Sequence, residues 1–304
     1  MTRVGFVGLG NLGRHLAASL LRAGFPLTVH DRKQEAARPL LDAGAVWASS
    51  PRDVAAASDS VFTCLPSPRA IDEVVAGSDG LLGGLRPGCT WIDTSTNDAH
   101  SLSRLAALAE AAGVNCLEAP VTGGVHLAAS GEITVLVGGD EEVYAAHLPA
   151  FEAIGGRVFH IGPLGSASVI KVITNMLAFV HVVAVGEALM LAKRGGLDLA
   201  QSFEVIRASS GSSFVHETES QVILNGSYDI GFTLDLACKD LRFAQELGQE
   251  LGVPLELVDL VERTFIRARE HYGGSAWSPM VVKLLEDALG TDLRAPGFPP
   301  AIQA

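Results

Sequence analysis

The stretch Arg3–Gly13, "RVGFVGLGNLG", decides the fold of this chain of 304 residues. It opens with a short β-branched run, which predicts a buried strand. It closes with Gly8, Gly10 and Gly13 in G-x-G-x-x-G spacing. Residues 11–23 then carry leucines at helical intervals, which predicts a helix directly after the glycines. A strand, a tight turn and a helix therefore follow one another without a linker.

The same alternation of strand and helix continues through the first half of the chain. Segments with helical spacing separate further short, β-branched runs. These runs are "LTVHD" (27–31), a short strand near Ala45, "SVFTCLP" (60–66), "TWIDTST" (90–96), "NCLEAP" (115–120), "ITVLVGG" (133–139) and "RVFHIG" (157–162). Alternation of this kind predicts an α/β fold with a doubly wound parallel sheet.

The pattern changes after Gly162, beyond which only helices are predicted. A long helix is expected from about Ser166 to Arg194, and Asp198 caps the next one. Further helices are expected near 235–251, 254–271 and 279–289, before an irregular, proline-rich tail at 295–304. We therefore predict two domains, an α/β domain over residues 1–163 and an all-helical domain over residues 164–304.

Composition narrows the class of protein. The formal net charge of −12 repels nucleic-acid phosphates and anionic lipid surfaces, so neither is an expected partner. The four cysteines are scattered and form no CxxC pair, which indicates reduced thiols and no zinc site. Strand-like residues follow Met1 directly, so we expect no signal peptide and a cytoplasmic location. The uncharged stretch from Val172 to Gly186 is shorter than a membrane span and is interpreted as a buried helix.

The glycine-rich turn fits a dinucleotide site. Gly8 allows the tight turn, Gly10 lets the backbone approach a pyrophosphate, and Gly13 lets the helix pack closely on the strand. The N-terminus of the helix offers free N–H groups and a partial positive charge to the phosphates. Asp31 ends the next strand, where an acid accepts hydrogen bonds from a ribose 2′-hydroxyl and favours NAD. Arg32 follows and could accommodate the 2′-phosphate of NADP, while Asp31 could instead only cap the next helix.

Two later segments place polar groups at the carboxyl ends of strands, where open α/β sheets bind ligands. The first is "DTSTN", Asp93–Asn97, and the second is "APVTGG", residues 119–124. Thr122, Gly123 and Gly124 offer a hydroxyl and closely approachable backbone N–H groups, which suit a substrate carboxylate.

Lys171 and Asn175 interrupt an otherwise apolar helical stretch, "SASVIKVITNML", one turn apart. Residues four apart share a helix face. Partly apolar surroundings are expected to lower the pKa of a lysine toward the working pH, so that Lys171 could exchange a proton with a hydroxyl or carbonyl oxygen. The alternative is a structural lysine that extends to solvent from a buried helix.

Taken together, these segments resemble the β-hydroxyacid dehydrogenase family, which includes 3-hydroxyisobutyrate dehydrogenase. The resemblance covers nearly the whole chain and implies a Rossmann domain followed by an all-helical domain for substrate binding and dimerisation. It rests on "GLGNLG" (8–13), "LP" (65–66), "DTST" (93–96), "APVTGG" (119–124), "GSASVIKVITN" (165–175) and "ACKDL" (237–241).

The resemblance also implies roles for individual residues. Lys171 matches the catalytic acid/base, and Asn175 matches an asparagine that assists at the substrate. Residues Thr122, Gly123, Gly124, Phe232 and Asp240 match substrate-site positions. The cofactor-binding positions are Gly8, Leu9, Gly10, Asn11, Leu12, Gly13, Asp31, Arg32, Leu65, Pro66, Thr96 and Lys239.

The chain departs from the family pattern near the expected far end of the substrate. Thr122 stands where serine is common, and His126 lies in a segment that often contains glycine; we interpret His126 as a solvent-facing loop residue. Imine reductases resemble the chain but lack the lysine at the position of Lys171, so its presence favours hydroxy acid chemistry.

We therefore predict an oxidoreductase that transfers a hydride between the 3-hydroxyl of a short 3-hydroxy acid, or the matching semialdehyde, and NAD or NADP. Candidate substrates include 3-hydroxyisobutyrate, glycerate and threonate. No metal is expected. A long apolar helix at 180–191 favours a homodimer or homotetramer. The alternatives are a non-catalytic NAD(H)-binding sensor or scaffold and, among enzymes, a glyoxylate or succinic semialdehyde reductase.

Overall fold

A computed structural model describes residues 2–302, and the chain forms two compact units, Met1–Lys171 and Val172–Ala304. The division falls inside helix α8, Ser166–Arg194, rather than between two secondary structure elements. The domain boundary at residue 163 stays a prediction. The terminal residues 1 and 303–304, which the predicted domains include, lie outside the described residues.

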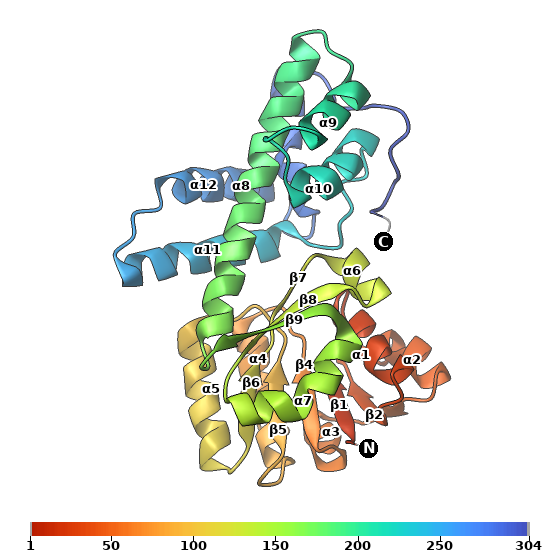
Figure 1. Cartoon of the computed structure of the whole chain (residues 1–304), viewed down its shortest axis with the longest axis vertical. Coiled ribbons are helices and arrows are strands. Elements are labelled where there is room, and N and C mark those ends of the chain that lie inside the picture. Colours follow the sequence, from red (N-terminus) through yellow and green to blue (C-terminus); the bar gives the residue numbers. More distant parts are fainter. Residues whose placement is uncertain (1, 303–304) are drawn as a thin grey trace. The chain divides into compact units, whose positions relative to one another are not determined.

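The first unit contains a nine-stranded sheet (Figure 1). Its strand order is β3-β2-β1-β4-β5-β6-β8-β7, with β9 paired to β8. The strands are β1 Val4–Val7, β2 Leu27–His30, β3 Val46–Trp47, β4 Ser60–Thr63, β5 Thr90–Asp93, β6 Asn115–Glu118, β7 Val121–Thr122, β8 Ile133–Gly138 and β9 Gly155–Gly162. The strands from β3 to β6 pair in parallel, which confirms the predicted doubly wound sheet.

Helices cover the sheet on both faces, so the central strands are buried on both sides, as parallel strands usually are. Phe6 packs in a core with Leu16 of α1, Gly13–Arg22, whereas its neighbour Val7 belongs to the other core. The first core also receives side chains from α2 Arg38–Asp42, α6 Val125–Ser130 and α7 Glu141–Ile154. The second core is built with α3 Pro51–Ala57, α4 Pro68–Ala76 and α5 Ala99–Ala111.

The far side of the sheet departs from a purely parallel arrangement. β8 runs antiparallel to β6, with Glu118 opposite Gly138, and the short strand β7 pairs antiparallel with β8. The chain keeps its direction from β6 through β7, and it reverses through the "VTGG" turn and α6, Val125–Ser130, before β8 begins. β9 pairs in parallel with β8, so these two strands run opposite to the others. The predicted parallel direction of the "ITVLVGG" and "RVFHIG" strands is therefore wrong relative to β6, although both strands are present and pair with each other in parallel.

The second unit is helical among the residues described in it (Figure 1). The predicted long helix matches α8, Ser166–Arg194. The others are α9 Leu199–Arg207, α10 Phe214–Asn225, α11 Leu234–Leu251, α12 Glu256–Tyr272, the 3₁₀ helix η3 Ser278–Val281 and α13 Lys283–Leu289. Their core is centred on Phe179 and Phe265, whose rings meet edge to face at 5.3 Å between centroids. The described part of the tail, residues 295–302, is irregular as predicted.

Helix α8 is the one helix of the described chain whose length and composition would suit a membrane span. Helices in the cores of soluble proteins also meet that criterion. About 39% of its most apolar 18-residue window is buried inside the chain. Leu177 and Leu191 remain 45% and 74% exposed. The stretch interpreted as a buried helix, residues 172–186, is therefore helical but only partly buried in the chain.

Candidate functional site

The glycine-rich loop after β1 has the geometry that a dinucleotide site needs. Gly8 has a φ of +99°, and a side chain there would lie 2.3 Å from the carbonyl oxygen of Cys64. A Cβ at Gly13 would lie 2.0 Å from the carbonyl oxygen of Gly8, so α1 packs directly on the loop. A Cβ at Gly10 would meet no atom within 4 Å. Gly8 and Gly13 are therefore required by the fold, whereas Gly10 leaves open space above the loop.

The start of α1 is available to an anion. Leu12 is the N-cap residue, and no side chain caps the helix. The first N–H groups of a helix have no partner within the helix and attract negative charge. Gly10 and Asn11 are exposed beside them. The loop therefore fits the pyrophosphate of a dinucleotide.

Asp31 is tied to the same loop. Its Oδ2 accepts a 2.8 Å hydrogen bond from the backbone N–H of Leu9. Its Oδ1 accepts a 2.8 Å hydrogen bond from the backbone N–H of Lys33. The carboxylate thus joins the end of β2 to the glycine-rich loop and also closes the turn before the 3₁₀ helix η1, Gln34–Ala37. Arg32 is exposed beside it. Each carboxylate oxygen has a second lone pair, so these bonds leave Asp31 able to accept further hydrogen bonds.

The loops after β4 and β5 are joined to each other and lie beside the glycines. The backbone N–H of Leu65 donates a 2.9 Å hydrogen bond to the hydroxyl of Ser95. A side chain on Gly8 would lie 3.1 Å from Leu65, so the two loops touch. Pro66 is exposed, and Thr96 follows Ser95 in a half-buried position. The predicted cofactor residues of this unit therefore share one edge of the sheet.

A buried carboxylate supports these loops. Asp93 is 2% exposed, and its Oδ1 accepts hydrogen bonds from Thr63 Oγ1 at 2.8 Å and from Ser95 Oγ at 2.6 Å. Its Oδ2 has no hydrogen-bond partner among the described residues. Burial raises the pKa of Asp93 to about 6, although the hydrogen bonds from Ser95 and Thr63 oppose the shift.

The "VTGG" segment forms a tight turn between β7 and α6. Gly123 and Gly124 have φ angles of +122° and +90°, which a residue with a side chain rarely adopts. Thr122 and Gly123 are half-buried, and Gly124 is exposed. His126 lies on α6 and is half-buried, and burial lowers its pKa. The interpretation of His126 as a solvent-facing loop residue is therefore wrong.

Lys171 lies in the second turn of α8 and is only 7% exposed. A lysine whose charged end reached bulk solvent would keep more exposed surface than this. The start of its helix is bonded to Glu118, at the end of β6. Glu118 accepts hydrogen bonds from the N–H groups of Gly165, Ala167 and Ser168 at 2.6, 2.8 and 3.0 Å, and also from the Ser168 hydroxyl.

The predicted residues of the second unit converge on one carboxylate. Asp240 is 1% exposed. Its Oδ2 accepts a 2.6 Å hydrogen bond from Asn175 Nδ2, and its Oδ1 forms a 2.6 Å ion pair with Lys239 Nζ. Lys239 also lies over the ring of Phe243, 4.7 Å from its centroid. Phe232 is half-buried and lies 6.1 Å from Phe179, between ring centroids.

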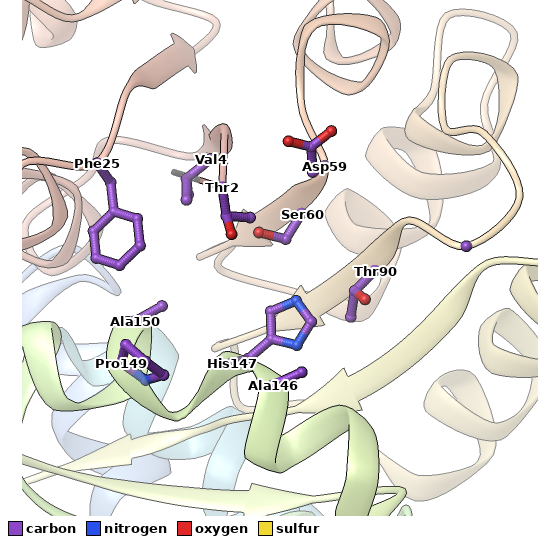
Figure 2. Close-up of a pocket in the computed structure, with 11 residues that line it drawn as sticks. Thr2, Val4, Phe25, Asp59, Ser60, Thr90, Ala146, His147, Pro149 and Ala150 are labelled. Carbon is purple, nitrogen blue, oxygen red and sulfur yellow. The ribbon is translucent and has the colours of Figure 1, made fainter.

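Other candidate sites are weaker. Among residues 2–302, no group of three or more His, Cys, Asp or Glu side chains could hold a metal ion. A pocket of about 250 Å³ lies at the amino ends of the parallel strands (Figure 2). Its lining includes Val4, Ser60, Thr90 and His147. Doubly wound sheets bind ligands at the carboxyl ends of their strands, so this pocket is not a candidate for the reacting site.

Two family models match the chain in succession. The NAD binding domain of 6-phosphogluconate dehydrogenase matches residues 3–162, and the NAD-binding domain of NADP-dependent 3-hydroxyisobutyrate dehydrogenase matches residues 165–285. The chain belongs to the β-hydroxyacid dehydrogenase family. This membership agrees with the order of domains and with the motifs that carry the predicted site.

Several dehydrogenases are similar to this chain over most of its length. NAD-dependent L-serine dehydrogenase of Pseudomonas aeruginosa is 37% identical over 82% of this chain and 86% of its own length. 2-(Hydroxymethyl)glutarate dehydrogenase of Eubacterium barkeri is 31% identical over 96% of this chain and 97% of its own. The crystal structure of 3-hydroxyisobutyrate dehydrogenase from Salmonella typhimurium is 31% identical, covers 93% of this chain and 100% of that one, and has a TM-score of 0.87.

These matches confirm the prediction of an NAD(P)-dependent hydroxyacid dehydrogenase. They give no support to the alternative of a non-catalytic sensor or scaffold. The roles assigned to individual residues stay predictions.

Glu118 was not singled out from the sequence as a candidate, and Asp93 was noted only as the first residue of the "DTSTN" segment. Each buried carboxylate ends a strand, and the two stand opposite each other in the β5–β6 pairing. An ionisable residue that closes an apolar strand is costly unless it is paired. That cost was visible in "TWID" and "NCLE". Ser95 lies two residues from Asp93, but Thr63 and the partners of Glu118 lie 30 to 50 residues away along the chain.

Proposed function

We propose that this dehydrogenase oxidises a primary alcohol that lies β to a carboxylate, HOCH₂–CH(R)–COO⁻, to the matching aldehyde. The compounds named for the relatives, L-serine, 2-(hydroxymethyl)glutarate and 3-hydroxyisobutyrate, share this fragment and differ in R. The fragment is a 3-hydroxy acid, as the sequence motifs predict. Reduction of a semialdehyde is the same reaction in reverse.

The observation that carries this proposal is the arrangement on α8. Lys171 and Asn175 stand one helical turn apart, and the buried Asp240 carboxylate fixes the amide of Asn175 by a 2.6 Å hydrogen bond. Residues four apart project from the same helix face. A buried lysine beside an oriented amide can hold a hydroxyl oxygen and exchange its proton.

In the proposed mechanism the residues of the chain bind the acid and move one proton. The N–H groups of Gly123 and Gly124 and the Thr122 hydroxyl hold the carboxylate. Asn175 orients the hydroxyl, and Lys171 accepts its proton as the C–H bond breaks. A nicotinamide cofactor held at the glycine-rich loop by Gly8, Gly10 and Asp31 would supply the acceptor for the hydride that leaves the alcohol carbon. In the reducing direction Lys171 returns the proton to the carbonyl oxygen.

NAD is the proposed cofactor in preference to NADP. Asp31 lies at the end of β2 and is held against the glycine-rich loop by Leu9. A fixed carboxylate there accepts hydrogen bonds from a ribose 2′-hydroxyl and repels a 2′-phosphate. Arg32, which could offset that repulsion, makes NADP the second candidate.

The test is NADH or NADPH formation over a panel of acids that vary R. The panel contains 3-hydroxyisobutyrate, L-serine, 2-(hydroxymethyl)glutarate and glycerate. Threonate, whose 3-hydroxyl is secondary, is added as a 3-hydroxy acid without this fragment, and glyoxylate and succinic semialdehyde are assayed for reduction. The proposal expects at least one HOCH₂–CH(R)–COO⁻ acid to be oxidised with higher kcat/KM with NAD than with NADP. Turnover confined to glyoxylate or succinic semialdehyde would favour the reductase alternative instead.

We also propose that the enzyme is a homodimer or homotetramer. The exposed apolar residues Leu177 and Leu191 of α8 support this, since an extended apolar surface favours association. Light scattering coupled to gel filtration measures the mass directly. A single species at 31.7 kDa, the mass of one chain, would contradict the proposal.

A further inference from the structure

We propose that Glu118 is a positioning residue of the enzyme, whose carboxylate sets the place of Lys171 relative to the "VTGG" turn. This inference rests on the proposed function, because it takes Lys171 as the acid/base. All of the residues involved belong to the first compact unit.

Glu118 links two elements that are far apart in the sequence. It is the last residue of β6 and is 1% exposed. Its Oε1 accepts hydrogen bonds from the N–H groups of Gly165 and Ala167, and its Oε2 accepts them from the N–H and hydroxyl of Ser168. One side chain therefore fastens the first turn of α8 to the end of a sheet strand.

The choice of a carboxylate follows from the helix terminus. The first N–H groups of α8 have no acceptor within the helix and carry a partial positive charge. An anion that accepts several of them satisfies the donors and the charge together, and such charge-assisted bonds are stronger than neutral ones. Burial raises the pKa of Glu118, while the hydrogen bonds from Ser168, Ala167 and Gly165 act in the opposite direction.

The opposite strand leaves room for this carboxylate. Gly138 of β8 stands opposite Glu118 in the antiparallel pair. A Cβ at Gly138 would lie 2.3 Å from Glu118 Oε1. The sheet therefore has a glycine where any side chain would displace the oxygen that binds Gly165 and Ala167.

The consequence for the site follows from the sequence spacing. Lys171 lies three and four residues after Ser168 and Ala167, so it projects from the helix face that Glu118 fastens. Thr122, at the start of the proposed carboxylate-binding turn, lies only four residues after Glu118 in the sequence. Glu118 thus connects Lys171, which moves the proton, to the "VTGG" turn, which binds the acid.

A cap that only stabilised the fold would act differently from a positioning residue. Loss of a purely stabilising cap would lower the melting temperature and leave the chemical step unchanged. Loss of a positioning residue would lower kcat, because displacing a catalytic group by about 1 Å can cost about 100-fold in rate. The KM for NAD would stay near its wild-type value, since the glycine-rich loop lies on other strands.

The experiment compares Glu118→Gln, Glu118→Asp and Gly138→Ala with wild type. Glutamine keeps the size but presents an amide N–H₂ to one set of donors, and aspartate keeps the charge on a shorter arm. Gly138→Ala displaces the carboxylate without removing it. The matched control is Glu286→Gln. Glu286 is likewise buried, at 2% exposed, and it accepts hydrogen bonds from Arg294 and from the backbone N–H of Leu293, but it lies in the other unit.

We expect kcat to fall by about 100-fold in Glu118→Gln, with the KM for NAD changed by less than about twofold. The deuterium isotope effect on kcat, measured with acid labelled at the alcohol carbon, should rise because the chemical step becomes limiting. Gly138→Ala should show the same pattern, and Glu118→Asp should recover part of the rate. Glu286→Gln should lower the melting temperature and leave kcat and the isotope effect unchanged.

Wild-type kcat and isotope effect in Glu118→Gln would overturn the positioning role. So would a loss of rate matched by Glu286→Gln at equal loss of melting temperature. If the wild-type enzyme oxidises no acid of the panel, the proposed function is wrong. If it is active and the Glu118 variants are equally active, only the present inference is wrong.

Discussion

The side-chain amide of Asn175 donates a 2.6 Å hydrogen bond to the carboxylate of Asp240, which is 1% exposed. The bond fixes which way the amide nitrogen points and therefore where the amide oxygen lies. Because the other carboxylate oxygen of Asp240 is paired with Lys239, one buried anion orients two of the predicted site residues. Asp240 thus supports two predicted site residues in the second unit, and its predicted position at the substrate stays a prediction.

Asp240→Asn should destabilise the enzyme and slow it. The substitution keeps the shape but removes the anion of the Lys239–Asp240 pair and sets an amide N–H₂ against one of two donors, Asn175 Nδ2 or Lys239 Nζ. Removing one partner of a buried ion pair typically costs about 3–5 kcal/mol. Urea unfolding measures the change in the free energy of unfolding. The control is Asp259→Asn, which breaks an exposed pair with Arg263 and should cost less than about 1 kcal/mol. Equal losses in the two variants would contradict the role given to Asp240.

Lys171→Ala should remove most of the activity and leave cofactor binding intact. Positioned acid/base groups contribute about 10²–10⁴-fold to rate, so we expect kcat to fall within that range. The matched control is Lys193→Ala on the same helix, where the lysine is paired with Asp292 at the surface. Steady-state kinetics and an NADH fluorescence titration give the two readouts. Retention of wild-type kcat by Lys171→Ala would make this lysine structural.

Asp93 should make the enzyme less stable as the pH rises from about 4 to about 6. The ordinary pKa of an aspartate is about 3.9, and burial raises that of Asp93 to about 6. In this interval the folded protein binds more protons at this residue than the unfolded chain, so the free energy of unfolding falls with increasing pH. Asp93→Asn should abolish this component, which is of order 1–3 kcal/mol. Urea unfolding at a series of pH values would show it as a difference in slope.

Asp59 provides a control of opposite sign. Hydrogen bonds from Arg3 lower the pKa of Asp59 to about 2. Its contribution to stability is therefore present above about pH 4 and is lost as the pH falls toward 2. Asp59→Asn should change the acid side of the stability profile and leave the interval from pH 4 to 6 as in wild type. If both variants change the same interval, the assignment to Asp93 is wrong.

The sequence predicts the parts of the fold that depend on local pattern. Periodicity located α8 because its apolar spacing is long and its ends are marked by Ser166 and Gly195. It did not predict the antiparallel direction of β8, because pairing direction depends on where the chain turns. The short strand β7 was missed for a related reason, since two residues carry no period and are held only by their pairing with β8.

The candidate site divides in the same way. Gly8, Lys171 and Asn175 could be found because each is unusual in its own segment. Asp240 contacts its neighbour Lys239 but also Asn175, 65 residues away, and Glu118 acts through partners 47 to 50 residues away along the chain. No local pattern contains such a contact, so their supporting roles required the structure.

Gly10 and Gly13 of the glycine-rich loop have different surroundings, so substitutions at the two positions should have different effects. A side chain on Gly13 would lie 2.0 Å from the Gly8 carbonyl oxygen, whereas one on Gly10 would meet nothing within 4 Å. Gly13→Ala should therefore destabilise the enzyme by forcing α1 away from the loop. Gly10→Ala should keep the wild-type melting temperature and lose NADH affinity, because its methyl group would occupy the space proposed for the pyrophosphate.

Thermal unfolding and NADH titration of the two variants separate these effects. We expect Gly10→Ala to weaken NADH binding by at least about tenfold, which corresponds to about 1.4 kcal/mol, with no change in melting temperature. The substitution at Gly13 should lower the melting temperature even in the absence of cofactor. Wild-type NADH affinity in Gly10→Ala would mean that the pyrophosphate does not lie over this loop, whatever the activity of the enzyme.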